Sequence, residues 1–130
     1  YPGLKGNYSE SSPLLPINNY AWSKLGGESS VQMYKNSLIL RASITQKPFV
    51  HNAAFGDFKT NFIFHEDLVS GIIKIINKKG VINIGGISQS VYNFAKKYNP
   101  NIKKIYAKKI FGEKARINLS MNIKKFKSFI

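Results

Sequence analysis

The sequence has no cysteine and only two histidines, His51 and His65, in 130 residues. Without cysteine there is no disulfide framework, no thiolate nucleophile and no thiolate metal site. Two imidazoles are too few to form a zinc or iron centre by themselves. We therefore predict no metal, and we expect a protein of a reducing compartment, the cytoplasm.

Long apolar runs are missing as well. No stretch approaches the roughly 18 residues of a membrane span, and no signal-peptide pattern opens the chain, so we expect no membrane association. The first residue is Tyr1 rather than Met. Because tyrosine is not what removal of an initiator Met normally leaves, we expect the sequence to be the downstream piece of a longer protein.

Acidic side chains are scarce: 6 stand against 20 basic ones, which gives a net charge of +14. Such a charge invites a nucleic-acid interpretation. Arg41 and Arg116 are the only arginines, however, and arginine is preferred for bidentate phosphate and guanine contacts. The lysines lack the regular aromatic interleaving of a single-strand binder, and no DNA-binding motif occurs. We predict a solvated basic surface without a nucleic-acid partner; an anionic small-molecule site stays open.

The first elements follow from capping and periodicity. After a loop rich in proline and glycine, Asn18 or Asn19 caps a helix predicted over 20–34. The pair Gly26-Gly27 costs this helix roughly 1 kcal/mol per glycine, which we explain by close packing on a neighbour. The apolar run over 37–44 predicts a buried strand.

The rest of the chain continues the alternation of helices and strands. The predicted elements are an irregular segment over 46–61, a short extended piece over 62–64, a helix from His65 that ends before Gly80, a strand over 81–84, a helix over 88–98, an ambiguous segment over 101–110 and a short helix capped by Ser120. This order predicts an α/β protein with parallel strands. Only two strands are convincing, and a two-stranded parallel sheet cannot bury both faces, so we expect an incomplete fold.

Tyr20 and Lys24 are spaced to lie one helical turn apart on one face. An ammonium group near a phenol favours the phenolate, and such a phenol can give a proton to a carbonyl oxygen as hydride reaches the carbon. The spacing alone decides nothing, since 7 tyrosines and 20 − 2 = 18 lysines in 130 residues produce about one such pair by chance.

Context separates this pair from two others. Tyr1/Lys5 is interrupted by proline and glycine and cannot be helical. Tyr92/Lys96 lies on a plausible helix, but its tyrosine falls among the apolar positions, which favours a packing role. The pair Tyr20/Lys24 opens a helix that leads into a strand, and ligands of α/β folds bind at the mouth of the sheet.

Five segments then resemble one family. Residues 13–28, P-L-L-P-I-N-N-Y-A-W-S-K-L-G-G-E, resemble the active-site helix of extended short-chain dehydrogenases/reductases, P-x-N-x-Y-G-x-S-K-x-x-x-E, which a strand like L-I-L-R at 38–41 follows. Similar segments come in the family's order at 80–86 (G-V-I-N-I-G-G), 90–96 (S-V-Y-N-F-A-K) and 118–126 (N-L-S-M-N-I-K-K-F). The sequence is thus similar to the NAD-dependent epimerase/dehydratase superfamily, in particular to dTDP-4-dehydrorhamnose reductases and related sugar-nucleotide-binding proteins.

The resemblance implies the C-terminal part of a Rossmann-like NAD(P)-binding α/β fold with its small substrate-binding region, the N-terminal half being missing. Residues 1–45 would end the dinucleotide-binding core with the active-site helix and the following strand. Residues 46–130 would form the substrate-binding region with the interleaved last core elements. The family's Gly-rich phosphate loop is absent, and its catalytic Ser or Thr would lie just before Tyr1. We therefore expect these residues alone not to turn over substrate.

The implied activity is reduction of a nucleotide-linked 4-keto-deoxysugar with NADPH or NADH. Tyr20 would be the general acid, and Lys24 would tune it and bind the nicotinamide ribose. Both residues would contact the cofactor, and Ala42, Ser43 and Ile44 would lie beside the nicotinamide. Alanine stands at 21 where the family usually has glycine, a departure that does not touch the chemistry.

Three residues are candidates for substrate contacts: Arg41, His51 and Asn52. Arg41 could meet a substrate phosphate, or it could pair with Glu28, since a buried charge needs a partner. His51 and Asn52 could meet sugar hydroxyls or be plain loop residues. Glu28 also stands four residues after Lys24, within pairing distance on a helix.

Other functions stay open. An epimerase or dehydratase of the same superfamily would use the same tyrosine and lysine. A non-catalytic sugar-nucleotide-binding or regulatory homologue would keep the fold without turnover. A homodimer is open as well, because Trp22 could lie in a subunit contact, pack on neighbours of its helix or stack on a nucleotide base.

Overall fold

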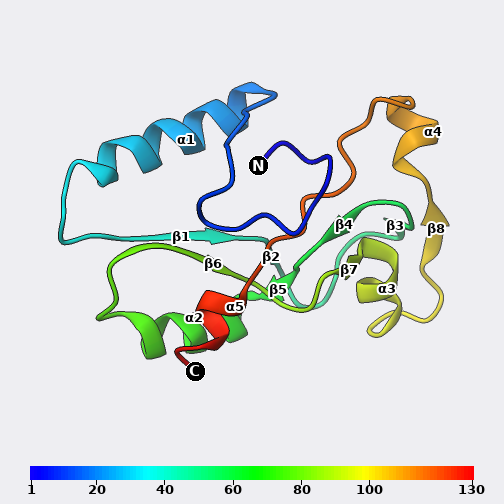
Figure 1. The fold of residues 1–130 in the computed structure, drawn as a ribbon. Helices are drawn as coiled ribbons and strands as arrows, with labels where there is room; N and C mark the ends of the chain where they lie inside the picture. Colours follow the sequence, from blue (N-terminus) through cyan, green and yellow to red (C-terminus); the bar gives the residue numbers. More distant parts are fainter.

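The computed structural model describes all 130 residues and shows short strands alternating with helices (Figure 1). The helices are α1 (Asn19–Gln32), α2 (His65–Ile75), α3 (Val91–Lys96), α4 (Ala107–Phe111) and α5 (Lys124–Lys127). The strands are β1 (Leu38–Ala42), β2 (Ile44–Thr45), β3 (Ala53–Phe55), β4 (Lys59–Thr60), β5 (Ile63–Phe64), β6 (Gly80–Ile84), β7 (Gln89–Ser90) and β8 (Lys103–Ile105). No helix is long and apolar enough to cross a membrane.

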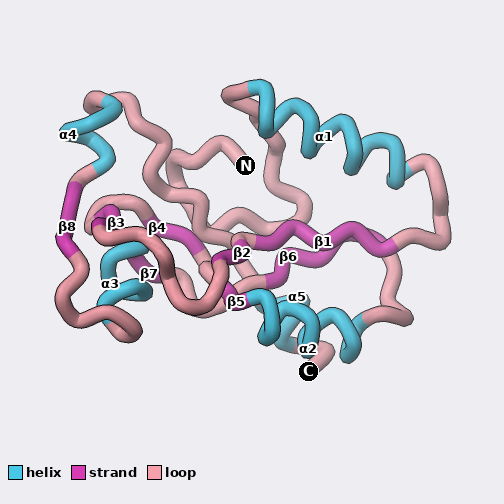
Figure 2. The backbone as a smooth tube through the Cα atoms, turned by 180° about the vertical axis from the view of Figure 1, so that it is seen from behind, coloured by secondary structure: helices cyan, strands magenta, loops and turns pink.

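The longest strands, β1 and β6, form a parallel pair, as the alternation of elements predicted. Their register runs from Leu38 opposite Gly80 to Ala42 opposite Ile84. Helix α1 lies on one side of this pair, and α2 and α5 lie on the other (Figures 1 and 2). The smaller elements β3, β4, β7, β8, α3 and α4 gather at the other end of the molecule.

The core on this side of the sheet is formed by β6, α2 and α5 together. It consists of five buried residues, namely Leu68, Ile75, Ile82, Ile84 and Phe126. Glu66 and Asp67 lie in the first turn of α2, where the helix dipole favours negative charge. On the same helix Val69 and Ile73 are exposed, and so is the C-cap residue Ile76.

Helix α1 begins as the sequence predicted and ends two residues earlier. The Asn18 side chain caps it by accepting a hydrogen bond from the Ala21 N–H at 2.8 Å. None of its residues is buried, and a Cβ at Gly26 or Gly27 would meet nothing within 4 Å. The expectation that this glycine pair packs closely on a neighbour is therefore wrong within this chain.

The second core lies between β3, α3 and β8. Ala54, Val91, Ala95 and Ile102 are buried in it, and four phenylalanines and Tyr92 pack against them. The segment over 46–61 thus contains β3 and β4 and is less irregular than predicted. Short strands such as these depend on their partners, since β3 pairs with β8 and β4 with β7, so local sequence gives little signal for them.

Helix ends in this part differ from the predictions. The N-cap of α3 is Ser90, two residues after the predicted start, and its hydroxyl accepts from the Asn93 N–H at 3.1 Å. Ser120 does not cap α5; its hydroxyl accepts from the Asn7 N–H at 2.9 Å. The ambiguous segment over 101–110 divides into β8 and most of α4.

Residue Asp57 caps α4 from a distant loop. Its carboxylate accepts from the backbone N–H groups of Ala107 and Lys108 at 2.7 and 3.1 Å. Burial acts to raise the pKa of Asp57, but these hydrogen bonds outweigh it and hold the pKa below its ordinary value. This contact joins the loop after β3 to α4.

Candidate functional site

The side chains of Tyr20 and Lys24 lie on one face of α1, one turn apart. The Lys24 Nζ lies 5.4 Å from the centroid of the Tyr20 ring. The tyrosine is 70% exposed, and Lys24 is exposed as well. The phenol and the ammonium group are therefore accessible to a ligand.

A hollow of about 690 Å³, here named the helix–strand hollow, lies between α1 and β1. Its lining is mostly apolar and includes every residue predicted to contact a cofactor: Tyr20, Lys24, Ala42, Ser43 and Ile44. The structure thus brings Tyr20 and Lys24 of α1 and the carboxyl end of β1 to one cavity.

A second hollow of about 710 Å³, here named the aromatic hollow, lies beyond β2. Its walls are largely apolar and include Phe49, Phe55, Phe58 and Phe62. The predicted substrate residues His51 and Asn52 also line it. Ile44 lines both hollows, so the two are neighbours across one side chain.

The junction after β1 is held by hydrogen bonds from the next segment. The Thr60 hydroxyl donates to the Ser43 hydroxyl at 2.9 Å, and the Ile63 N–H donates to the Ser43 carbonyl at 3.0 Å. Thr60 is itself buried. These bonds fix the backbone that separates the two hollows.

Arg41 forms a two-point ion pair with Glu28 on α1. Its Nη2 donates to Glu28 Oε1 at 2.5 Å and its Nε to Oε2 at 3.0 Å. The two side chains are only 13% and 12% exposed. Of the two alternatives for Arg41, the pairing with Glu28 is present; contact with a substrate stays a prediction.

Arg41 also contacts the start of the chain. Its Nη1 donates to the Tyr1 hydroxyl at 2.8 Å and to the Glu10 carbonyl at 2.9 Å. Burial acts to lower the pKa of Arg41, but the hydrogen bonds to Glu28 and Tyr1 outweigh it and raise the pKa above its ordinary value. The guanidinium group therefore stays charged.

Two buried asparagines, Asn61 and Asn83, make structural hydrogen bonds that were not predicted from the sequence. The Asn83 side chain, on β6, accepts from the Tyr1 hydroxyl at 2.6 Å and donates to the Tyr8 carbonyl at 2.9 Å. The Asn61 side chain accepts from the Met121 N–H at 2.6 Å and donates to the Gly86 carbonyl at 2.9 Å. The one available signal was the position of Asn83 inside the apolar run of β6, since such a buried amide needs partners; Asn61 lies between β4 and β5 without such a signal.

Close backbone contact explains the glycine pair after β6. A Cβ at Gly85 would lie 2.6 Å from the Asn61 carbonyl oxygen, and one at Gly86 would lie 2.4 Å from the Phe62 carbonyl oxygen. Only glycine lets the chain pass this closely behind the junction of the two hollows.

The comparisons with known proteins rest on structure. No protein-family model and no curated protein sequence matches this chain. A hypothetical dTDP-4-dehydrorhamnose reductase from Sulfolobus tokodaii matches with a TM-score of 0.84 at 24% identity, over 100% of this chain and 55% of that one. The dTDP-4-dehydrorhamnose reductase of Bacillus anthracis, crystallised with NADP, matches with 0.73 at 21% identity, over 99% and 57%.

An epimerase shares the same architecture. The UDP-glucuronic acid 4-epimerase of Bacillus cereus, in complex with NAD, matches with a TM-score of 0.68 at 21% identity, over 96% of this chain and 48% of that one. This chain therefore spans about half the length of the solved chains that it resembles. Its fold is that of the C-terminal part of Rossmann-like reductases and epimerases, and the fold class predicted from the sequence is confirmed.

Proposed function

We propose that the chain is the part of an NAD(P)H-dependent reductase that carries the catalytic Tyr20–Lys24 pair and the pocket for a nucleotide-linked 4-keto-deoxysugar. The observation that carries this proposal is the convergence of that pair with the carboxyl end of β1 on one hollow. The match in fold to reductases of such sugars supports it. Because the chain spans about half of those proteins, the activity belongs to the assembly that contains the whole fold.

The residues of the helix–strand hollow fit a nicotinamide cofactor. Its apolar lining suits a flat ring, and the exposed ammonium of Lys24 suits ribose hydroxyls, which accept hydrogen bonds. Ala42, Ser43 and Ile44 would lie beside the ring. The cofactor, NADPH or NADH, supplies the hydride when bound.

The chain's own residues handle the proton. The Tyr20 hydroxyl is accessible and would donate its proton to the carbonyl oxygen of the sugar as that oxygen gains negative charge. The Lys24 ammonium, 5.4 Å from the tyrosine ring, stabilises the phenolate that remains. Solvent returns a proton to the exposed phenolate and completes the cycle.

The aromatic hollow would receive the substrate. Its phenylalanine walls offer flat apolar surfaces for a base, and His51 and Asn52 offer hydrogen-bonding groups for sugar hydroxyls. In this proposal residues 1–45 belong to the dinucleotide-binding core together with the interleaved core elements β6, α2 and α5, and the rest of 46–130 forms the substrate region. The absence of cysteine supports a reducing, cytoplasmic location.

The test is turnover by the assembled enzyme with NADPH and a dTDP-linked 4-keto-6-deoxysugar. A reductase oxidises one cofactor per sugar, whereas an epimerase or dehydratase leaves the amount of reduced cofactor unchanged. The 130 residues alone should bind the sugar nucleotide without reducing it. Equal product formation without net cofactor oxidation would favour the epimerase or dehydratase alternative, and binding without any turnover by the assembly would favour the non-catalytic one.

A further inference from the structure

One ion pair joins the catalytic helix to the sheet. Besides the pair between Glu28 and Arg41, no hydrogen bond or ion pair connects α1 with any strand. The other side-chain bonds of α1 stay within the helix or its cap, and none of its residues is buried. The position of α1 over β1 therefore depends on this contact to an unusual degree.

Both oxygens of the Glu28 carboxylate already accept hydrogen bonds. Oε1 accepts from Arg41 Nη2 at 2.5 Å and from Gln32 Nε2 at 3.1 Å, and Oε2 accepts from Arg41 Nε at 3.0 Å. Lys24 stands one turn before Glu28, within pairing distance on a helix. It forms no ion pair with Glu28, and its ammonium group lies over the Tyr20 ring instead.

The guanidinium group of Arg41 uses most of its donors in this arrangement. Four hydrogen bonds, two to Glu28, one to the Tyr1 hydroxyl and one to the Glu10 carbonyl, use its donors. A guanidinium group has five N–H donors, so five minus four leaves one. A two-point grip on a phosphate needs two parallel donors, and the Arg41 side chain is also 13% exposed.

We propose that Arg41 is a positioning residue that acts through Glu28 on Lys24. By occupying both carboxylate oxygens, Arg41 prevents Glu28 from pairing with Lys24, and the lysine ammonium stays directed to Tyr20. Without Arg41, the released carboxylate attracts the ammonium one turn away, and the phenol loses its cationic neighbour. The catalytic consequence rests on the proposed function; the exchange of partners itself does not.

The exchange can be observed on the 130-residue chain without substrate or cofactor. NMR of a sample labelled in lysine Nζ and glutamate Cδ detects a hydrogen-bond coupling between the Lys24 ammonium and the Glu28 carboxylate. We expect no coupling in the natural sequence, a coupling in Arg41→Met, and none in Arg41→Met combined with Glu28→Gln. Absence of the coupling in Arg41→Met, with the amide spectrum of β1 and β6 retained, would overturn the proposal.

Two milder variants cover the case in which Arg41→Met does not fold. Arg41→Lys keeps the charge but has no planar fork, so it should free one oxygen of Glu28 and give a weaker coupling to Lys24. Glu28→Gln alone should keep the Lys24 ammonium over the Tyr20 ring, because the native lysine does not pair with Glu28. Loss of the nuclear Overhauser contact between the Lys24 and Tyr20 side chains in Glu28→Gln would contradict the proposal. Lys108→Met, which breaks the exposed pair between Lys108 and Glu113, is the matched control and should change neither signal.

Kinetics of the assembled enzyme give the functional readout. Arg41→Met should lower kcat by about 10–100-fold, a part of the roughly 100–10,000-fold that positioned proton transfer contributes. Adding Glu28→Gln should recover part of that loss, because no carboxylate then competes for Lys24 while the tie between α1 and β1 stays broken. Loss without recovery would sink the positioning role. If no variant and not even the natural sequence shows turnover, the proposed function fails while the NMR result stands.

Discussion

Replacement of Asn83 by alanine tests the buried polar network that joins the start of the chain to β6. Asn83 is 0% exposed. Its side chain accepts from the Tyr1 hydroxyl at 2.6 Å and donates to the carbonyls of Tyr8 and Asn122 at 2.9 and 3.2 Å. The variant removes all three bonds, although the Tyr8 carbonyl still accepts a hydrogen bond from the Asn122 N–H at 2.8 Å.

The expected loss of stability follows from the cost of these groups. A hydrogen bond contributes about 0.5–1.5 kcal/mol net, and a buried group without a partner costs about 1–3 kcal/mol. For Asn83→Ala, the three lost bonds at this net value should lower the free energy of unfolding by about 1.5–4.5 kcal/mol in total. Since a domain has only about 5–15 kcal/mol in total, the change should be large.

Urea unfolding of the 130-residue chain, followed by circular dichroism, measures this loss. The midpoint should fall while the slope with denaturant stays unchanged, because the exposed surface is the same. Asn101→Ala, at an exposed asparagine, is the matched control and should change stability by no more than about 0.5 kcal/mol. A loss below about 1 kcal/mol for Asn83→Ala would refute the reasoning, since a single net hydrogen bond accounts for that much.

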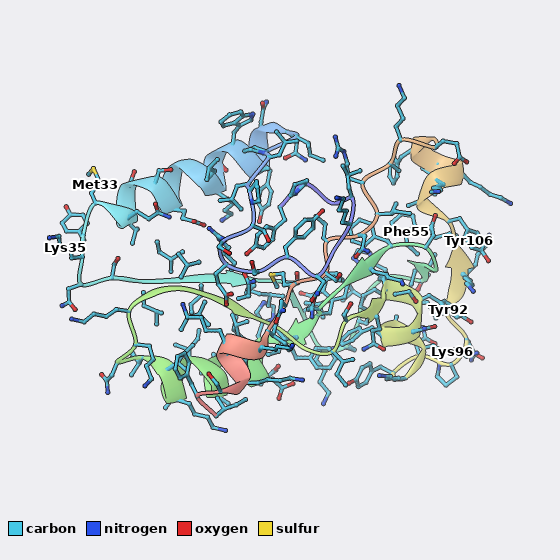
Figure 3. The ribbon with its side chains drawn as sticks, viewed as in Figure 1. Met33, Lys35, Phe55, Tyr92, Lys96 and Tyr106 are labelled. Atoms are coloured by element: carbon cyan, nitrogen blue, oxygen red, sulfur yellow. The ribbon has the colours of Figure 1, made fainter.

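Three further predictions concern the site and its supports. In the assembled enzyme Tyr20→Phe should lower kcat by roughly 100–10,000-fold with cofactor affinity retained. The control is Tyr92→Phe: the Tyr92 ring also has a lysine over it, at 5.6 Å, but it lies at the end of the molecule opposite Met33 (Figure 3). This control should leave kcat unchanged, and equal losses in the two variants would contradict the role proposed for Tyr20. The pKa of Asp57 is lower in the folded chain than its ordinary value of about 3.9. The stabilisation by this carboxylate is therefore present above that ordinary value and is lost as the pH falls through the folded pKa. The melting temperature of Asp57→Asn should be lower than that of the natural sequence at neutral pH and should fall less on acidification; an equal fall in both would count against this. Gly27→Ala, with open space around its Cβ, should stabilise the isolated chain by about 0.5–1 kcal/mol. Gly85→Ala would place a Cβ 2.6 Å from a carbonyl oxygen and should destabilise the chain by about 1–3 kcal/mol. A higher melting temperature for Gly85→Ala than for Gly27→Ala would refute this geometry.

Local signals in the sequence were sufficient for the longer elements. The Asn18 cap, the start of α2 at His65 and the apolar run of β1 are each defined within a few residues, and all three are present in the structure, although β1 is half-buried throughout rather than buried as predicted. Since the alternation of these elements also predicted parallel pairing, the β1–β6 pair followed. The family resemblance then gave the fold class, which periodicity alone left incomplete.

Contacts between distant residues could not be predicted in the same way. Arg41 bonds to residues 40, 31 and 13 positions away, and nothing in the local sequence marks Tyr1 or Glu10 as its partners. The prediction that the glycine pair in α1 packs closely failed for a related reason, because such packing requires a neighbour that these 130 residues do not place there. The roles assigned to Tyr20 and Lys24 stay predictions, although the structure places both at one hollow.

Because none of its residues is buried, α1 should unfold before the rest of the molecule. Isolated helices of about 12–15 residues are marginal in water, and α1 has 14 residues with a single polar tie to the sheet. Its amide protons should exchange by local opening, well before those of β1 and β6, which belong to the most protected part of the molecule. The Tyr20 phenol would then leave its place while the rest of the chain is still folded, so under the proposed function loss of activity would precede unfolding.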